Sequence, residues 1–338
     1  MRIDPQRIQD AQMLLARHFG PTRIARAASL SSAGHDVFLK LETDLPTGSF
    51  KVRGAIYSLS VNVARGVMRE VVCASTGNHG AAVAHAAQLL GVPATIFLPA
   101  MPNPVKAARI RALGAQIVES GIDLSAAIEA ASEYAERASA FFLHDASDPD
   151  VPVGTATIGM EIVDQVPAVD VIYVPMGDTA LIRGVALAAK QQRPSLAHPS
   201  ITIVGVVAEQ APAYFLSWRE SRRPKGSGLT AQGSELRADD IVETATCNTI
   251  ADGLAVRRPL AANVAAIRDL VDDVVVVSEQ EMIDAIELLY SREQVTAEPA
   301  GAAAMAALLQ RPTAARTSVV LVTGSNITPG LRPTPAKR

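Results

Sequence analysis

The stretch VVCASTGNHG, residues 71–80, joins a run of apolar residues to small polar residues and glycines. A run that is apolar on both faces is typical of a strand buried in a parallel sheet. The small polar residues that follow predict a turn at which a helix begins. Backbone N–H groups at such a helix start bind carboxylates or phosphates, although an ordinary capped turn has the same sequence pattern.

The same alternation of strand and helix continues along the chain, with apolar runs predicting strands and alanine-rich segments between them predicting helices. The predicted strands are Asp36–Glu42, Val71–Ser75, Ala94–Leu98, Gln116–Glu119, Val169–Pro175, Ile201–Val207, Val274–Val277 and Ser318–Val322. The predicted helices are Gly80–Leu90, Pro104–Leu113, Thr179–Lys190, Glu279–Tyr290 and Gly301–Leu309. This order predicts an α/β fold whose sheets are mainly parallel and carry helices on both faces.

Length and composition limit the classes of protein to consider. The 338 residues are 49% hydrophobic and 19% charged, which is enough for two domains with buried cores. A net charge of -3 without a long basic run argues against a nucleic-acid-binding protein. The sequence has no signal peptide and no apolar run of the ~18 residues that a membrane span requires. Two cysteines are too few for a disulfide framework, so we expect a protein of the reducing cytoplasm.

Several catalytic signatures are absent from the sequence. It contains no GxxxxGK[ST] phosphate loop, no GxGxxG dinucleotide fingerprint, no GxSxG nucleophile turn and no HExxH zinc motif. The six histidines do not have the spacing of metal ligands, so no metal site is predicted.

A lysine stands in an unusual setting within the stretch TGSFKVRGA, residues 47–55. Lys51 opens a predicted helix, where the helix dipole disfavours a cation and should depress the pKa of the amine. A lysine with a depressed pKa is the type that forms Schiff bases, although a solvated lysine at a helix start is the simpler alternative. A second strand ends at Pro175 and is followed by another helix start, so a second anion site is predicted there.

Seven segments, in order along the chain, give this sequence a specific resemblance. Ser49–Ala55 resembles the SFKxRGA signature of fold-type II pyridoxal 5′-phosphate enzymes, in particular the threonine/serine dehydratase (ammonia-lyase) family that also contains serine racemase. The other matching segments are Ser75–Gly80, Asp148–Asp150, Gly154–Thr157, Thr249–Val256, Glu298–Ala302 and Thr323–Asn326. The resemblance extends from about residue 20 to residue 327 and implies a two-domain, tryptophan synthase β-like fold.

The resemblance implies roles for individual residues. Lys51 would hold pyridoxal 5′-phosphate as a Schiff base and then act as the general base on the substrate. Phe50 would stack on the pyridine ring, Asn78 would bind the ring's 3′ oxygen, and Thr323 would bind the ring nitrogen as a neutral hydroxyl, which suits elimination. Ser75, Thr76, Gly77, Asn78 and His79 would hold the substrate carboxylate, with His79 as either a structural or a catalytic residue. The family's phosphate would bind at Gly177, Asp178, Thr179, Ala180 and Leu181.

The sequence departs from the family at three places. The phosphate loop of the family has four glycines, whereas Asp178, Thr179 and Ala180 add side chains here; we expect the Asp178 carboxylate to point away or to meet a cation or donor. Thr76 replaces a serine that serves serine racemase as an acid/base. Phe215 replaces an acidic ligand of that enzyme's divalent cation. We also expect no C-terminal regulatory domain.

The resulting hypothesis is dehydration and deamination of a small 3-hydroxy amino acid, such as threonine or serine, to a 2-oxo acid and ammonia. The alternatives are a β-replacement enzyme related to cysteine synthase, an amino-acid racemase, and a non-catalytic sensor on the same fold. We expect a homodimer. The predicted domains are a large cofactor-binding domain (residues 1–52 and 154–328) and a small substrate-clamping domain (residues 53–153), followed by a tail (residues 329–338).

Overall fold

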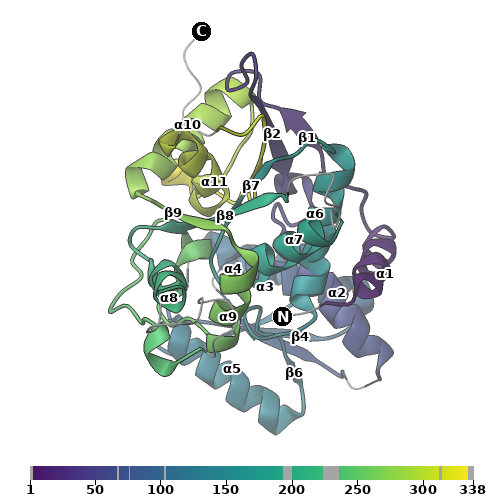
Figure 1. The fold of residues 1–338 in the computed structure, drawn as a ribbon. Coiled ribbons are helices and arrows are strands. Elements are labelled where there is room, and N and C mark those ends of the chain that lie inside the picture. The colour runs from purple at the N-terminus through teal and green to yellow at the C-terminus, as the bar shows by residue number, and fades with distance from the viewer. Residues whose placement is uncertain are drawn as a thin grey trace.

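The computed structural model describes residues 3–66, 68–75, 77–102, 104–192, 200–223, 236–311 and 314–333. Within these ranges the strands form two sheets (Figure 1). The strands are β1 Ile24–Arg26, β2 Asp36–Leu41, β3 Val71–Ala74, β4 Ala94–Leu98, β5 Gln116–Glu119, β6 Phe141–Phe142, β7 Val171–Pro175, β8 Thr202–Ala208, β9 Asp273–Val277 and β10 Thr317–Val322.

The larger sheet has the strand order β1-β2-β10-β7-β8-β9, and the smaller sheet has the order β5-β4-β3-β6. Only β1 pairs in the antiparallel direction; every other pairing between these strands is parallel. All eight strands predicted from the sequence are present, which confirms the α/β class. The two that the sequence did not predict, β1 and β6, have three and two residues, too few for a periodic pattern.

Helices connect the strands. They are α1 Pro5–Leu15, α2 Lys51–Ala64, α3 Asn78–Leu90, α4 Pro104–Ala112, α5 Leu124–Ala138, α6 Val151–Gln165, α7 Ala180–Gln191, α8 Ala213–Ser221, α9 Ala261–Leu270, α10 Glu279–Glu293 and α11 Pro299–Gln310, with short 3-10 turns at Glu42–Asp44, Ala238–Asp240, Asp252–Leu254 and Pro329–Leu331. The five helices predicted from the sequence are all present. Others, such as α1 and α5, lack a clear apolar pattern and were not predicted.

Helices cover both faces of the larger sheet, as alternate residues of β10 show. Val320 and Val322 pack in one hydrophobic core with α10 and α11. Val319 and Leu321 point the other way and pack in a second core with α6, α7 and α9. In Figure 1, α10 and α11 lie with the larger sheet in the upper part of the view, and α5 lies with β4 and β6 in the lower part. A sheet buried on both faces explains why its strands are apolar at nearly every position.

Two strands distant in sequence place the start of α2. β2 and β10 are parallel neighbours in the larger sheet, so the turns that follow them meet at one edge. The Phe50 amide donates a hydrogen bond to the Thr323 carbonyl at 3.0 Å, and Ser49 forms an isolated bridge with Gly324. Lys51, the first residue of α2, is therefore fixed against the end of β10.

Helices α2 and α6 approach each other so closely that only glycine fits at the contact. A Cβ atom added at Gly154 would lie 2.6 Å from the Arg53 carbonyl oxygen and 2.8 Å from the Gly54 Cα. We expect Gly154→Ala to lower the free energy of unfolding by about 1–3 kcal/mol, because the two backbones must separate. Denaturant titration measures this loss. The matched control is Gly20→Ala, where nothing lies within 4 Å of the added atom; an equal loss in both variants would contradict the steric explanation.

The predicted domain boundaries stay a prediction. All strands of the smaller sheet lie between residues 71 and 142, yet the boundaries at 52/53 and 153/154 fall inside α2 and α6. Residues 329–333 of the predicted tail contain a short 3-10 turn, and residues 334–338 lie outside the described part of the chain.

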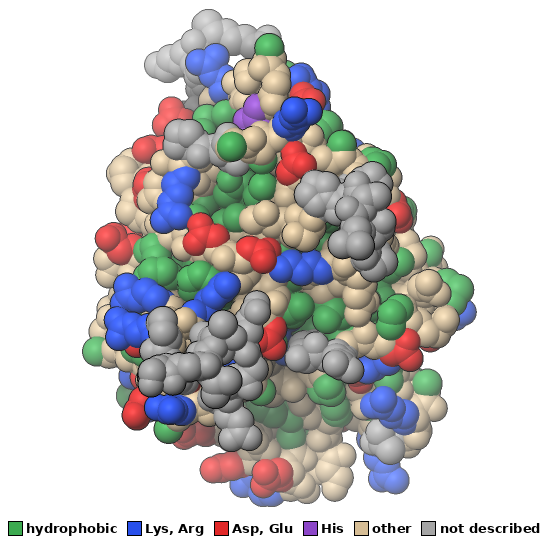
Figure 2. All heavy atoms as spheres, in the orientation of Figure 1, with side chains coloured by type: hydrophobic (Ala, Val, Ile, Leu, Met, Phe, Trp, Pro, Cys, Tyr) green, Lys and Arg blue, Asp and Glu red, His purple; other side chains and the backbone are tan. Residues whose placement is uncertain are grey.

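The helices and the surface bear on the predicted absence of a nucleic-acid or membrane partner. In the described ranges, none of the helices combines the length and the apolar character of a membrane span. On the face that Figure 2 shows, acidic and basic side chains are intermixed, with hydrophobic and neutral groups between them. The intermixed charges fit the small net charge of the sequence.

Candidate active site

A cavity of about 730 Å³ lies where the carboxyl ends of the two sheets face each other. Twelve of the predicted site residues line it: Phe50, Lys51, Ser75, Gly77, Asn78, His79, Gly177, Asp178, Thr179, Ala180, Leu181 and Thr323. Thr76, which was also predicted, lies outside the described residues. The fold therefore brings together segments that are up to about 270 residues apart, as the parallel topology requires.

Lys51 is paired with a carboxylate that the sequence analysis did not identify. Its Nζ atom forms an ion pair with Asp145 and lies 5.3 Å from the centroid of the Phe50 ring. Burial lowers the pKa of the Lys51 amine, but the charges of Asp145, Asp178 and Glu298 outweigh burial and raise the pKa above its ordinary value. The predicted depression of this pKa is therefore wrong for the cofactor-free chain, because nearby carboxylates outweigh both burial and the helix dipole.

Asp145 and Asp178 form a coupled acid pair beside this lysine. Burial, followed by the neighbouring Asp145 charge, raises the pKa of Asp178 to about 7. Burial also opposes ionisation of Asp145, but Lys51 and His79 outweigh it, so the pKa of Asp145 lies well below its ordinary value. As expected, Asp178 meets a cation and a donor: it faces Lys51 and Arg183 and shares a hydrogen bond with Asp145.

Ionisation of Asp178 should shape the pH dependence of stability in the cofactor-free protein. Asp178 stays protonated up to about pH 7 in the folded chain, whereas the unfolded chain releases this proton above about pH 3.8. The folded state binds more protons between these values, so its stability falls as pH rises through the window, by up to about 1 kcal/mol per pH unit. We expect Asp178→Asn to flatten this fall in denaturant titrations, while the exposed Asp284→Asn keeps the wild-type slope. Parallel curves for the wild type and Asp178→Asn would contradict the raised pKa.

The turn before α7 has two features that only some side chains tolerate. A Cβ atom at Gly177 would lie 2.1 Å from the Gly253 carbonyl oxygen, so this position must be glycine. Thr179 has a left-handed backbone with φ of 69°, which is uncommon for a β-branched residue and marks a strained position. The strain places the Thr179 side chain at the first turn of α7, beside the cavity.

This turn fits the phosphate of the cofactor that the resemblance implies. The Thr179 hydroxyl is buried, with 2% of the residue exposed, and no hydrogen-bond partner for it exists in the described residues. A buried donor without a partner is rare and costs stability unless a ligand satisfies it. Together with the N-terminal amides of α7, the hydroxyl provides the donors that a phosphate group requires.

The amide of Asn78 is held on both sides. Its nitrogen donates to Glu298 at 2.5 Å and its oxygen accepts from Asn326 at 2.6 Å. One N–H of the amide stays available toward the cavity, since the nitrogen carries two. Thr323, 3% exposed, makes one long hydrogen bond of 3.4 Å to the Ala300 carbonyl, so its hydroxyl retains capacity for another partner.

The start of α3 also faces the cavity. The Ser75 hydroxyl accepts a hydrogen bond from the Gly77 amide at 3.2 Å, and α3 begins at Asn78. His79 lies 3.2 Å from the Leu143 carbonyl through Nε2 and 3.8 Å from Asp145 through Nδ1. Burial lowers the pKa of His79, so the ring is neutral at neutral pH and its Nε2 atom donates to Leu143. This bond favours the structural role for the histidine.

Sequence reasoning missed the residues that hold the acid pair. Asn263 donates from its side-chain nitrogen to the Ala146 carbonyl at 3.0 Å and to the Asp178 carbonyl at 3.3 Å. Arg183 donates to the same Ala146 carbonyl at 3.1 Å. The only signal in the sequence was the acidic loop after Phe142, which was identified as a cavity wall without a role for Asp145. We expected this loop to reach Gly154, but α6 begins at Val151, because Asp148 accepts from the Val151 amide at 2.9 Å and Pro152 suits a first helical turn.

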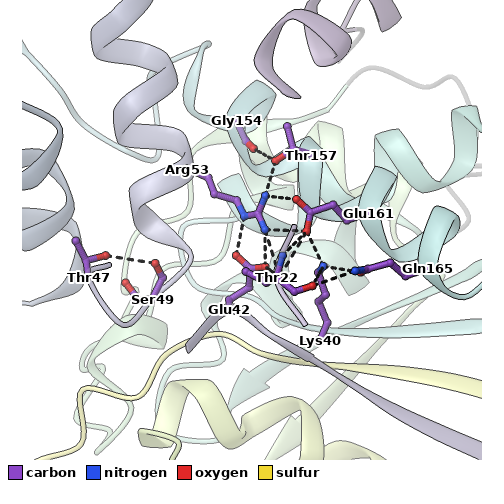
Figure 3. Close-up of polar contacts among 10 residues, drawn as sticks. All are labelled: Thr22, Lys40, Glu42, Thr47, Ser49, Arg53, Gly154, Thr157, Glu161 and Gln165. Carbon is purple, nitrogen blue, oxygen red and sulfur yellow. Dashed lines mark hydrogen bonds and ion pairs between the residues drawn. The ribbon is translucent and has the colours of Figure 1, made fainter. Parts of the chain in front are cut away.

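A buried ionic network supports α2 two residues beyond the lysine (Figure 3). Arg53, 1% exposed, donates to Glu42 at 2.8 Å and to Glu161 at 2.6 Å. Lys40, fully buried, lies 2.5 Å from Glu161 and 2.9 Å from the Thr22 carbonyl. Two cations and two carboxylates balance in charge, so each side chain depends on its partners to remain ionised in the interior.

Comparisons with known proteins agree with this geometry. A family described as pyridoxal-phosphate dependent enzyme matches residues 15–324. The L-threonine ammonia-lyase of Thermotoga maritima is 35% identical over 322 residues, covering 95% of this chain and 75% of the relative.

Two solved structures are similar over nearly the whole chain. Maize serine racemase has a TM-score of 0.85 at 30% identity and covers 98% of this chain and 95% of its own. A bacterial threonine deaminase, from the source abbreviated T.th., has a TM-score of 0.82 at 28% identity, covering 96% of this chain and 99% of its own. With a family match over most of its length and a cavity that presents a lysine and a partnerless buried hydroxyl, this chain belongs to the pyridoxal-phosphate dependent enzymes of the threonine ammonia-lyase and serine racemase group.

Proposed function

We propose that this enzyme removes water and ammonia from a small 3-hydroxy amino acid, such as threonine or serine, to give a 2-oxo acid. The observation that carries the proposal is the Lys51 amine, which faces a cavity with one anion site at the start of α7 and another at the start of α3. An amine between two anion sites suits a phosphate-bearing cofactor and an amino-acid carboxylate. The similarity to threonine ammonia-lyases supports the choice of reaction.

The site residues would divide the work as follows. Pyridoxal 5′-phosphate, when bound, withdraws electrons from the substrate's α-carbon and so makes loss of its proton easier. Lys51 would hold the cofactor covalently and then accept that proton at Nζ. Phe50 would pack against the ring, Asn78 would donate to the ring's oxygen, and the Thr323 hydroxyl would face the ring nitrogen. The residues that complete the two anion sites are Gly177, Asp178, Thr179, Ala180 and Leu181 for the phosphate, and Ser75, Thr76, Gly77, Asn78 and His79 for the substrate carboxylate.

The proposal is tested by product formation without any added nucleophile. The purified, cofactor-loaded enzyme is incubated with L-threonine, L-serine and other 3-hydroxy amino acids, and the 2-oxo acid and ammonia are measured. We expect equal amounts of the two products. Products that form only after a thiol is added would show a β-replacement enzyme instead.

Racemisation is the second candidate, favoured by the structural similarity to maize serine racemase. Chiral chromatography of the same incubations distinguishes it: a racemase converts L-serine to D-serine faster than it releases 2-oxo acid. The sensor alternative predicts neither product.

We also propose the remaining features expected from the sequence: a homodimer in the cytoplasm, and a small domain of residues 53–153 that clamps the substrate against the large domain. The resemblance to fold-type II enzymes supports these expectations. Light scattering of the loaded enzyme measures the oligomeric state; a monomer at working concentrations would reject the dimer.

A further inference from the structure

Three side chains from separate parts of the fold form a connected chain at the cavity wall. Lys51 starts α2, Asp145 lies in the loop between β6 and α6, and Asp178 precedes α7. Lys51 is ion-paired with Asp145, and Asp145 shares a hydrogen bond with Asp178. All three line the cavity, so a proton on any of them is within reach of the others and of a bound substrate.

The hydrogen bond between the two carboxyl groups requires a proton, and the surroundings place it on Asp178. Lys51 and His79 stabilise the Asp145 carboxylate, whereas Asp178 is disfavoured as an anion by burial and by Asp145, and favoured only by Lys51 and Arg183. The Tyr214 hydroxyl, the remaining titratable group beside it, is neutral because burial raises its pKa. A phosphate at the start of α7 adds negative charge and holds this proton more firmly.

The separation of the two acids is fixed by the backbone that carries them. Asn263 donates to carbonyl groups of both segments, at Ala146 and at Asp178, and Arg183 donates to the first of these. Asn263 is 3% exposed and also donates to the Tyr214 hydroxyl at 3.3 Å. Such buttressing is what a site requires when its acid must be held in one position.

We propose that Asp178 is the general acid of the elimination and that Asp145 returns its proton from Lys51. This inference rests on the proposed function. Lys51 takes the proton of the substrate's α-carbon, and the electrons of that bond form the double bond between the α- and β-carbons. The β-carbon–oxygen bond breaks with its electron pair on oxygen, which takes the Asp178 proton and leaves as water. The Lys51 ammonium then gives its proton to Asp145, so that the acid pair again holds one proton and the amine is free.

A substrate whose leaving group needs no proton tests this role. We expect Asp178→Asn to lower the rate of 2-oxo acid release from L-serine about 100-fold or more, since general acids contribute about 10²–10⁴-fold. The rate with 3-chloroalanine should change less than about threefold, because chloride leaves without protonation. The chloride reaction also shows that the variant is folded and loaded. Equal losses for both substrates, or no loss for serine, would overturn the inference, and Asp284→Asn is the control for the substitution itself.

Asp145 has its own prediction as a positioning residue. Asp145→Asn cannot take the proton from Lys51, so it should slow L-serine turnover and shift its pH profile, with a smaller effect on a single turnover. An unchanged pH profile would remove Asp145 from the pathway.

Binding of pyridoxal 5′-phosphate to the cofactor-free enzyme gives a measure that does not depend on activity. If Asp178 is protonated, Asp178→Asn leaves the affinity near pH 6 within about threefold, and the wild type loses up to about tenfold more affinity per pH unit than the variant above pH 7. Much tighter binding by the variant near pH 6 would show an ionised, repelling Asp178 and overturn the inference. A wild type that releases chloride from 3-chloroalanine but 2-oxo acid from no 3-hydroxy amino acid overturns the proposed function as well, whereas a wild type active on serine with an unaffected Asp178→Asn overturns only this inference.

Discussion

Replacing Lys51 by alanine is expected to lower 2-oxo acid release by about 10³-fold or more and to abolish the visible absorbance of the covalently held cofactor. The amine would serve as both the attachment point and the base, and no other lysine lines the cavity among the described residues. The loss of Lys51 also leaves Asp145 without its ion-pair partner. Steady-state rates and absorbance spectra of the two proteins measure the effect.

Lys51→Arg separates the chemistry of the amine from its charge. The guanidinium keeps a cation beside Asp145 but cannot be deprotonated in a protein, so it can neither hold the cofactor covalently nor take a proton. We expect the arginine variant to be as inactive as the alanine variant. A variant that keeps the visible absorbance, or a rate within tenfold of the wild type, would remove Lys51 from the centre of the mechanism.

Replacing Arg53 by methionine is expected to lower the free energy of unfolding by about 3–5 kcal/mol. The substitution leaves Glu42 and Glu161 buried with one cation fewer, and an uncompensated buried charge is among the most destabilising changes known. Burial opposes the charge on Arg53, but the two glutamates raise its pKa, which shows how strongly the network favours the ion. Denaturant titration of the cofactor-free protein measures the loss.

Arg65→Met is the matched control on the same helix. The Arg65 side chain is 58% exposed and lies 3.6 Å from Asp150, so its removal should cost no more than about 1 kcal/mol. If the two variants lose equal stability, the Arg53 network is not the source of the effect. Because α2 begins at Lys51, Arg53→Met should also weaken cofactor binding more than the control does.

The fold was predictable because its strands are buried on both faces. Apolar runs such as Ile172–Val174 have no other place than the centre of a parallel sheet, and all eight predicted strands are present. The helices were harder to predict. In α1 the buried residues are only Ile8, Ala11 and Leu15, too few for a clear period, whereas α6 is buried along most of its length and shows none.

The members of the candidate site were predictable only where a short motif carries them. Lys51, Asn78 and Thr323 stand in such motifs, and the fold brings them to one cavity. Asp145 was not predicted as a partner of Lys51, because the sequence distance between them is set by a whole β-sheet rather than by a turn. For the same reason the pKa of Lys51 was predicted in the wrong direction: local sequence gives the helix dipole but not the charges that distant segments contribute.

The position of β10 in the larger sheet has a consequence for the synthesis of this protein. β10 is the last strand along the chain, yet it lies between β2 and β7. While the ribosome is still making residues before 317, the β1–β2 pair has no neighbour to join it to β7, β8 and β9. The nascent chain must therefore wait, with one sheet edge of each part exposed, and a truncation that removes β10 should leave a chain that is recognised by chaperones and cannot retain its coenzyme.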